Sequence, residues 1–263
     1  MFFTSIAART DLGLVRQGNE DSALYHPKLI AVADGMGGAV GGEVASRIAI
    51  TKLAERIEVL QSKDLDDESR VDLLQGVLAE IESGLSDEIS RDRKLHGMGT
   101  TLTALMPLDD SIAMLHVGDS RAYRIRGSAI SRLSHDHTIV QELVDQGKLH
   151  PDEMHDHPQR SMLTQALMGN GSKGSEFDLF PIQLFPLEKD DIYLVASDGL
   201  TAVLSDDLIL KFVAGNSLEQ AANNLIAATR DGGAPDNVTI ILAKVVKSSD
   251  EVSSISFLGA AHE

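Results

Sequence analysis

The chain has 263 residues, a formal net charge of −17 and no cysteine. This length suits one large domain or two small ones, and we expect one. The acidic balance argues against a nucleic-acid partner or an anionic membrane surface, and the lack of cysteine excludes disulfides, thiolate metal sites and a cysteine nucleophile. No apolar run approaches the roughly 20 residues of a membrane span, and Met1–Arg9 lacks the order of a secretory signal, so we expect a cytoplasmic protein.

The first part of the chain is predicted to hold two strands separated by a polar turn. The strands are expected at Ser5–Leu14 and Lys28–Ala33, and the turn at Val15–Ser22 is typical of a surface loop with an ion pair. The second strand ends at Asp34, which a glycine-rich run follows. Glycine permits positive φ and the close approach of a carbonyl to a ligand. This turn either leads simply into the next helix or holds a hard cation through Asp34 and a neighbouring carbonyl.

The middle of the chain is predicted to form two helices followed by antiparallel strands. Apolar residues recur at helical spacing in Glu43–Leu60 and again in Val71–Ile89, each time as a single stripe. Short apolar runs separated by turn residues come next, and this pattern predicts hairpins. These strands are expected at Thr101–Met106, Ile112–Val117, Arg121–Arg126 and Ala129–Leu133.

Residues 134–174 differ from the rest of the chain because they are polar and lack a core pattern. We expect an excursion on the surface that contains a short helix at Ile139–Gln146. The segment is rich in histidine, which raises the alternative of a zinc site. The pairs His135/His137 and His155/His157 are spaced i,i+2, however, and not at the helical i,i+4 spacing, so zinc is not favoured.

The last third of the chain alternates strands and helices. Strands are predicted at Glu176–Leu184, at Asp190–Asp198 and from Val238, and helices at Asp206–Val213 and Leu218–Thr229. The serine-rich tail at 248–263 is expected to be flexible, and residues 1–247 are assigned to a single domain. Because parallel βαβ alternation is absent, the element order predicts an α+β fold, a four-layer α-β-β-α sandwich of two antiparallel sheets flanked by helix pairs.

Aspartates border four of the apolar runs. Asp34, Asp119 and Asp198 end such runs, and Asp236 precedes the last one. If the last strand is antiparallel to the others, all of these carboxylates meet at one edge of the sheets. Two like charges 4 Å apart cost about 4 kcal/mol at an effective dielectric of 20, so either some carboxylates protonate or cations lie between them. Oxygen is the ligand type on offer, which favours Mg²⁺ or Mn²⁺.

Short motifs extend this pattern along the chain. They are Arg16–Asp21, Val32–Gly38, Gly99–Thr101, His116–Tyr123, Ser197–Leu200 and Asp236–Thr239. In this order they resemble the motifs of the metal-dependent protein phosphatase family, the type 2C serine/threonine phosphatases, in its bacterial branch. The resemblance covers residues 16–239 and implies a β-sandwich with a dinuclear Mn²⁺ or Mg²⁺ centre at one edge.

The resemblance also implies a set of metal ligands. Asp34 would bridge the two ions, Asp198 and Asp236 would hold one of them, and the Gly35 carbonyl would help to hold the other. Asp119 together with Asp198 would hold a third, weaker ion.

Two more residues take roles from the resemblance. Glu20 would hold metal-bound water, and Arg16 resembles the phosphate-binding arginine. Two cations about 3.5–4 Å apart can share a water, lower its pKa and present hydroxide to phosphorus, so no protein nucleophile and no phosphoenzyme is required. Arg16 can meet two phosphate oxygens with its planar fork, and each such bond contributes about 1.5–3 kcal/mol.

One departure concerns the general acid. Many relatives carry a histidine in or just after the Asp-Gly-x-Gly-Gly turn, where this chain has Met36 and Ala39. The acid is therefore unassigned: a metal-bound water is one candidate, and His137 swinging in from residues 134–174 is another. That segment resembles the flap of the family and is expected to shape which phosphoprotein fits.

The sequence therefore predicts a metal-dependent phosphoserine/phosphothreonine protein phosphatase that acts in signal transduction. The alternatives are a catalytically weak or pseudo-phosphatase that serves as a regulatory binding module, an unrelated hydrolase and an acidic cation-binding protein. Expected partners are phosphorylated proteins and, by resemblance, a serine/threonine protein kinase and its targets. We expect a monomer.

Overall fold

The structure, a computed structural model, describes residues 2–37, 41–60, 62, 64–170, 180–246 and 254–262. The strands are β1 (Phe2–Asp11), β2 (Asp21–His26), β3 (Leu29–Met36), β4 (Gly99–Thr100), β5 (Leu102–Pro107), β6 (Ser111–Val117), β7 (Arg121–Arg126), β8 (Ala129–Arg132), β9 (Gln183–Pro186), β10 (Ile192–Ala196), β11 (Val238–Val246) and β12 (Ser256–Gly259). The α-helices are α1 (Gly41–Leu60), α2 (Asp67–Arg91), α3 (Ile139–Asp145), α4 (Asp198–Thr201), α5 (Asp206–Val213) and α6 (Leu218–Asp231). Short 3₁₀ turns lie at Arg93–Leu95 and Pro151–Glu153.

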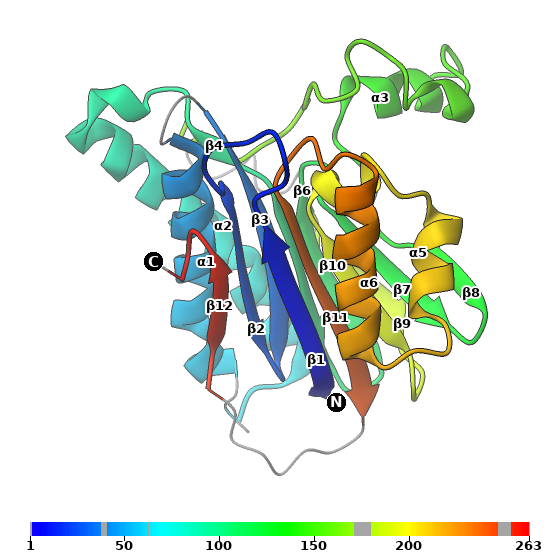
Figure 1. Ribbon diagram of the computed structural model, residues 1–263. Coiled ribbons are helices and arrows are strands. Elements are labelled where there is room, and N and C mark those ends of the chain that lie inside the picture. The colour runs from blue at the N-terminus through cyan, green and yellow to red at the C-terminus, as the bar shows by residue number, and fades with distance from the viewer. Residues whose placement is uncertain are drawn as a thin grey trace.

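Two antiparallel sheets pack face to face between pairs of helices (Figure 1). One sheet has the strand order β1-β11-β10-β7-β8, and the other has the order β12-β2-β3-β5-β6-β9, with β4 paired to β3. Helices α1 and α2 cover the second sheet and α5 and α6 cover the first. The predicted four-layer sandwich is confirmed.

Side chains along β3 point alternately to its two faces, so its apolar run packs against the other sheet on one face and against helices on the other. Ile30 and Val32 face the other sheet, whereas Leu29, Ala31 and Ala33 pack toward α1 and α2. All of them are fully buried. A strand with both faces covered has no solvent side, so its sequence is apolar throughout.

Helix starts follow the capping rules that the sequence carries. Asp66, Ser205 and Ser217 each accept a hydrogen bond from a main-chain N–H of the first turn of α2, α5 and α6. Helix α5 has the predicted bounds, and α2 begins before the predicted Val71 because Asp66 caps it in the acidic linker. No helix in the described part of the chain is long and apolar enough to cross a bilayer.

The first strand was expected at Ser5–Leu14 and lies at Phe2–Asp11, and three other strands differ more strongly from the sequence-based expectation. β2 occupies residues assigned partly to a polar turn, and β9 starts at Gln183, later than the predicted Glu176, while residues 176–179 lie outside the described residues. The prediction of a flexible tail at 248–263 is wrong for β12, which pairs with β2 from Ser256 to Gly259. Edge pairing depends on the partner strand, which a local pattern does not reveal.

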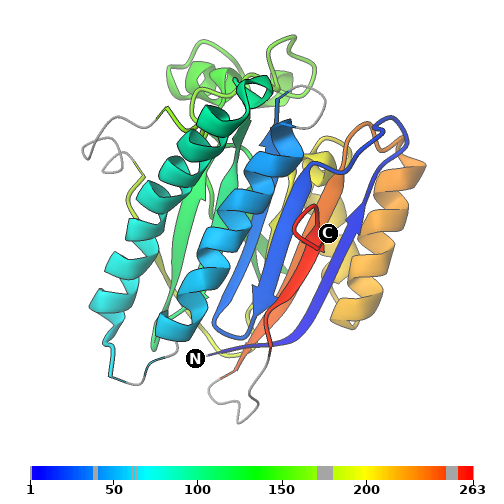
Figure 2. The same ribbon diagram turned by 90° about the vertical axis from the view of Figure 1, so that its left-hand side faces the viewer.

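The flap, residues 134–170 of the described chain, lies across one end of the sandwich (Figure 2). Isolated β-bridges join Thr138 to Leu163 and Thr100 to Leu167. At its far end the Met168 N–H donates to the Glu82 carboxylate at 2.9 Å. These contacts fix the base and the return of the flap over the end of the sheets at which β3 stops.

Candidate metal centre

The predicted acidic residues meet at one edge of the sandwich. β3 carries Asp34 near its end, Asp198 follows β10, and Asp236 precedes β11. Because β11 is antiparallel to β10, with Ala196 opposite Ile240, the start of one strand lies beside the end of the other. A cavity of about 550 Å³ opens here, and its lining includes Arg16, Glu20, Asp34, Gly35, Asp119, Asp198 and Asp236. The structure thus brings together every residue that the sequence nominated as a metal ligand, along with Arg16 and Glu20.

The carboxyl groups of this cavity are poorly stabilised as anions. Burial, followed by the charges of Asp21, Asp198 and other acids, raises the pKa of Asp34 well above its usual value. Burial and Asp198 raise the pKa of Asp119 to about 8, and burial and Asp236 raise the pKa of Asp198 to about 6. Burial also raises the pKa of Glu20, against the opposing effect of Arg16. Divalent cations would relieve this repulsion, and an all-oxygen donor set suits Mg²⁺ and Mn²⁺.

Arg16 provides the positive charge at the rim of the cavity. Its Nη2 atom lies 2.6 Å from Asp236 Oδ2 and its Nη1 atom lies 3.8 Å from Glu20 Oε2. The hydrogen bond to Asp236 raises the pKa of Arg16. Asp236 Oδ1 accepts from the Asn237 N–H, so both carboxylate oxygens have protein donors. As they are arranged here, no three acidic or imidazole side chains of the described residues form a group that could hold a metal ion.

Gly35 is required by main-chain packing. A Cβ atom at this position would lie 2.0 Å from the Gly42 carbonyl oxygen and 2.7 Å from that of Glu20. Its N–H donates to the Glu20 carbonyl at 3.1 Å, which joins the Arg16–Glu20 loop to β3. The glycine-rich run was expected to use positive φ at Gly35, Gly37 and Gly38. Gly37 does so, with φ of 122°, and Gly35 does not. Gly38 lies outside the described residues.

Asn237 holds the loop that presents Glu20, and the sequence analysis assigned it no role. Its Oδ1 atom accepts from the Glu20 N–H at 2.9 Å. Its Nδ2 atom donates to the carbonyl oxygens of Leu12 and Gly18. An asparagine directly before a buried strand was the available signal, because its amide can serve three main-chain groups at once.

Asp21 is a second residue without an assigned role. It is fully buried beside the cavity, and its Oδ2 atom accepts from the Ser197 hydroxyl at 2.8 Å. Burial raises its pKa to about 7. The signal in the sequence was its position directly after Glu20 in the Arg16–Asp21 motif.

His137 does not line the cavity. Its main-chain N–H donates to the Gly118 carbonyl at 2.8 Å, and its Nδ1 atom accepts from the Gly118 N–H at 3.0 Å. Its ring packs between His116 and Phe180, with centroid distances of 4.9 and 5.8 Å. The ring is therefore fixed next to the turn that carries Asp119. Met36 lines the cavity, and Ala39 lies outside the described residues.

Comparison with known proteins places this geometry in a family. Residues 17–231 match the family model described as protein phosphatase 2C. The chain belongs to the protein phosphatase 2C family. Among curated relatives, the serine/threonine protein phosphatase PstP of Mycobacterium tuberculosis is 39% identical to this chain over 243 residues. The aligned region covers 91% of this chain and 45% of PstP. The chain thus spans about half the length of that relative.

Two further likenesses extend along nearly the whole chain. The protein phosphatase PhpP of Streptococcus pneumoniae is 32% identical over 253 residues, which cover 94% of this chain and 99% of PhpP. A crystal structure of the catalytic domain of PstP in complex with two manganese ions has a TM-score of 0.82 and 35% identity, and it covers 93% of this protein phosphatase 2C chain and 99% of the solved one.

Proposed function

We propose that this chain is a metal-dependent phosphoserine/phosphothreonine protein phosphatase that uses Mn²⁺ or Mg²⁺. The observation that carries the proposal is the cavity that Asp34, Asp119, Asp198 and Asp236 line together, in which burial and neighbouring acids raise the pKa of Asp34, Asp119 and Asp198. Membership of the protein phosphatase 2C family and the two manganese ions in the PstP catalytic domain support it.

The proposed ligand roles are those that the resemblance to the family implies. Asp34 is proposed to bridge two ions, with Asp198 and Asp236 on one of them and the Gly35 carbonyl on the other. By the same resemblance, Asp119 and Asp198 are the proposed ligands of a third, weaker ion, and Asp198 is the charge that most raises the pKa of Asp119. A cation at Asp236 would compete with Arg16 for the charge of this carboxylate.

Glu20 and Arg16 complete the proposed reaction site. Glu20 faces the cavity from a loop fixed by Asn237, which suits it to orient a metal-bound water. When bound, the cations would lower the pKa of a shared water so that it attacks phosphorus directly, without a phosphoenzyme. Arg16, once released from Asp236, offers its fork to two phosphate oxygens and orients the group for in-line attack.

We assign no histidine as the general acid that protonates the leaving group. Within the described residues, the lining of the cavity contains no imidazole, and His137 is tied to Gly118. A metal-bound water therefore remains the proposed source of the proton. Aryl phosphates need less protonation on leaving, so they are expected to react faster than alkyl phosphates.

The wider setting is also part of this proposal. Residues 1–247 are taken as one catalytic domain that includes the flap. Phosphorylated proteins are the proposed substrates, with a serine/threonine protein kinase and its targets as the proposed partners, and a cytoplasmic monomer as the proposed state.

The test is hydrolysis of p-nitrophenyl phosphate and of a phosphothreonine peptide with Mn²⁺, with EDTA, and with the variant Asp34→Asn. Turnover is expected with Mn²⁺ alone and is expected to be lost in the other two cases. Asp72→Asn, an exposed position on α2, removes the same charge elsewhere and should keep activity. Metal-independent turnover would reject the proposal, and Mn²⁺ binding without turnover on any phosphopeptide would favour the pseudo-phosphatase alternative.

A further inference from the structure

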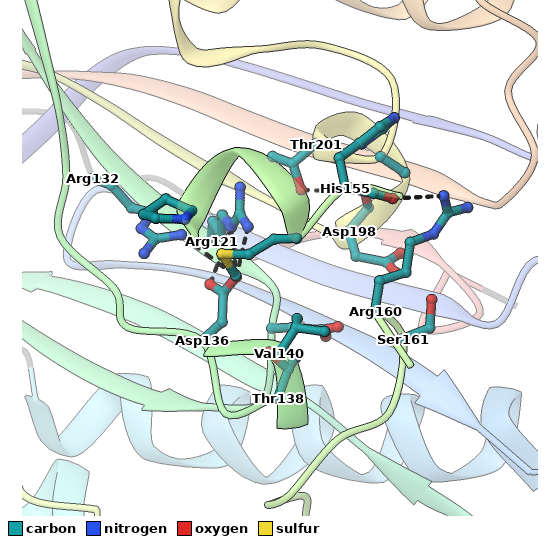
Figure 3. Close-up of a pocket in the computed structure, with 14 residues that line it drawn as sticks. Arg121, Arg132, Asp136, Thr138, Val140, His155, Arg160, Ser161, Asp198 and Thr201 are labelled. Carbon is teal, nitrogen blue, oxygen red and sulfur yellow. Dashed lines mark hydrogen bonds and ion pairs between the residues drawn. The ribbon is translucent and has the colours of Figure 1, made fainter. Parts of the chain in front are cut away.

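A second cavity of about 310 Å³ lies between the flap and the end of the first sheet (Figure 3). Its walls come from the flap, from β7 and β8, and from α4 and the residue after it. Asp119, Ser161 and Asp198 line both this cavity and the candidate metal centre. The two cavities are therefore neighbours that share a wall.

The second cavity is rich in arginine, although the chain as a whole carries a net charge of −17. Arg121, Arg132 and Arg160 line it. Figure 3 shows Arg121 and Arg132 with Asp136 on one side of the pocket and Arg160 on the other side. Apart from the two aspartates shared with the metal centre, Asp136 is the acid in its lining. Three arginines thus face three aspartates, of which Asp119 and Asp198 also line the candidate metal centre, where cations would offset their charge.

The contacts of these arginines leave donors free for a ligand. Arg121 binds Asp136 through Nε and Nη2, and Arg132 reaches the same carboxylate at 3.5 Å while its Nη2 atom donates to Gln141. One buried carboxylate thus faces two guanidinium groups. The side chains of Arg121 and Arg132 stay 22% and 27% exposed.

Arg160 has less compensation than the other two. Its Nη1 atom donates to the His155 carbonyl oxygen at 3.1 Å. Across the part of the chain that the structure describes, no carboxylate forms an ion pair with it. A guanidinium with unused planar donors in a hollow is suited to a carboxylate or a phosphate.

We propose that this cavity is a subsite for an anionic group that flanks the phosphorylated residue of the substrate, either a carboxylate or a second phosphate. This inference rests on the proposed function, because the neighbouring centre would hold the phosphate that is hydrolysed. Bound cations offset the charges of Asp119 and Asp198, and the groups that then face an anion are Arg132 and Arg160. Arg121 is mainly engaged in holding Asp136.

The test compares phosphothreonine peptides of one length that differ at the flanking positions, which carry alanine, glutamate, phosphothreonine or lysine. The expected kcat/KM rises about tenfold from alanine to an acidic neighbour, as one charge-assisted hydrogen bond implies, and falls with lysine. The glutamate and phosphothreonine peptides distinguish the two sources of the anion. Added salt should reduce the preference only in part, since the subsite is partly buried.

Variants of the lining arginines test whether the preference for acidic peptides arises in this cavity. Arg132→Gln and Arg160→Gln are each expected to reduce the ratio of acidic to neutral peptide toward one, and Arg9→Gln, on β1 and paired with Glu219, is the matched control that keeps the ratio. If Arg132→Gln does not fold, Arg160→Gln on the exposed flap decides. Equal kcat/KM for acidic and neutral peptides, or an equal loss on every peptide in both variants, would overturn the subsite. Failure of wild type to hydrolyse p-nitrophenyl phosphate with Mn²⁺ would instead overturn the proposed function.

Discussion

Arg16 and Asp236 form an ion pair of 2.6 Å across the mouth of the candidate metal centre. Each is nominated for a different partner, the arginine for phosphate and the aspartate for a cation. The guanidinium thus neutralises a carboxylate that is itself a proposed cation ligand. We therefore expect cation binding at Asp236 and phosphate binding at Arg16 to influence each other.

Replacing Arg16 should separate the two roles. Arg16→Ala is expected to lower kcat/KM by tenfold to about a hundredfold, because one charge-assisted bond to phosphate contributes about 1.5–3 kcal/mol. The same change should tighten Mn²⁺ binding, since a competing positive charge leaves Asp236. Arg16→Lys keeps the charge without the fork and should recover part of the loss. Steady-state kinetics and titration calorimetry measure the two effects, and unchanged kcat/KM would contradict the assignment.

Gly35 should tolerate no side chain. Gly35→Ala places a Cβ atom 2.0 Å from the Gly42 carbonyl oxygen and 2.7 Å from that of Glu20, so β3 has to move away from the first turn of α1 and from the loop at Glu20. We expect a loss of about 1–3 kcal/mol in the free energy of unfolding, the usual cost of overpacking, together with lost Mn²⁺-dependent activity. Gly18→Ala is the matched control, because no atom lies within 4 Å of its Cβ position. Urea unfolding and activity that remain equal in both variants would refute the packing argument.

His137 is expected to act as a positioning residue for the flap and not as the general acid. His137→Ala leaves the Gly118 N–H without its acceptor and should raise KM for a phosphopeptide. The ratio of alkyl to aryl phosphate turnover should stay the same, whereas loss of an acid would lower it. His137→Asn supplies an acceptor near the Nδ1 position and should rescue KM. His150→Ala, an exposed histidine of the same flap, serves as control.

The sequence predicted the acidic residues at the edge of the sheets more successfully than it predicted the bounds of the neighbouring strand β2. Asp34, Asp198 and Asp236 could be found because each adjoins a continuous apolar run, and antiparallel pairing then determined that they meet. β2 gave no comparable signal, because it opens with Asp21 and Ser22, which are polar and yet fully buried. Their partners come from distant segments, for example Ser197 for Asp21.

The second cavity was also beyond sequence reasoning. Arg121, Arg132 and Arg160 are separated in the chain and belong to no shared motif. They meet because the flap returns over the end of β7 and β8, and the bridge between Thr138 and Leu163 sets that return. Only tertiary contacts specify such a meeting.

His116 gives the protein a measurable pH dependence of stability. Burial, with a smaller effect of His137, lowers its pKa to about 4 from a usual value of 6.5. Between these values the unfolded chain binds the proton and the folded chain does not, so stability is lost as the pH falls from about 6.5 to about 4. The full shift corresponds to about 3 kcal/mol.

His116→Gln isolates this contribution, because glutamine does not titrate and the site carboxylates titrate in both proteins. The difference in unfolding free energy between variant and wild type should change by up to about 3 kcal/mol over that window. Urea titrations at pH 7, 6, 5 and 4 measure it. A difference that does not vary with pH would show that folding leaves the pKa of His116 unchanged.

Docking of β12 is expected to support the start of β2 and through it the loop at Glu20. The Ala260 N–H donates to the Asp21 carbonyl at 2.8 Å, and Gly259, with φ of 65°, lies so close that a Cβ atom would be 2.0 Å from the same oxygen. Gly259→Ala should therefore destabilise the protein and lower Mn²⁺-dependent turnover. Gly127→Ala is matched in backbone strain, with φ of 60° and no atom within 4 Å, and should cost only the left-handed penalty of about 1–2 kcal/mol. If urea unfolding gives the two variants the same stability, β12 contributes nothing through this contact.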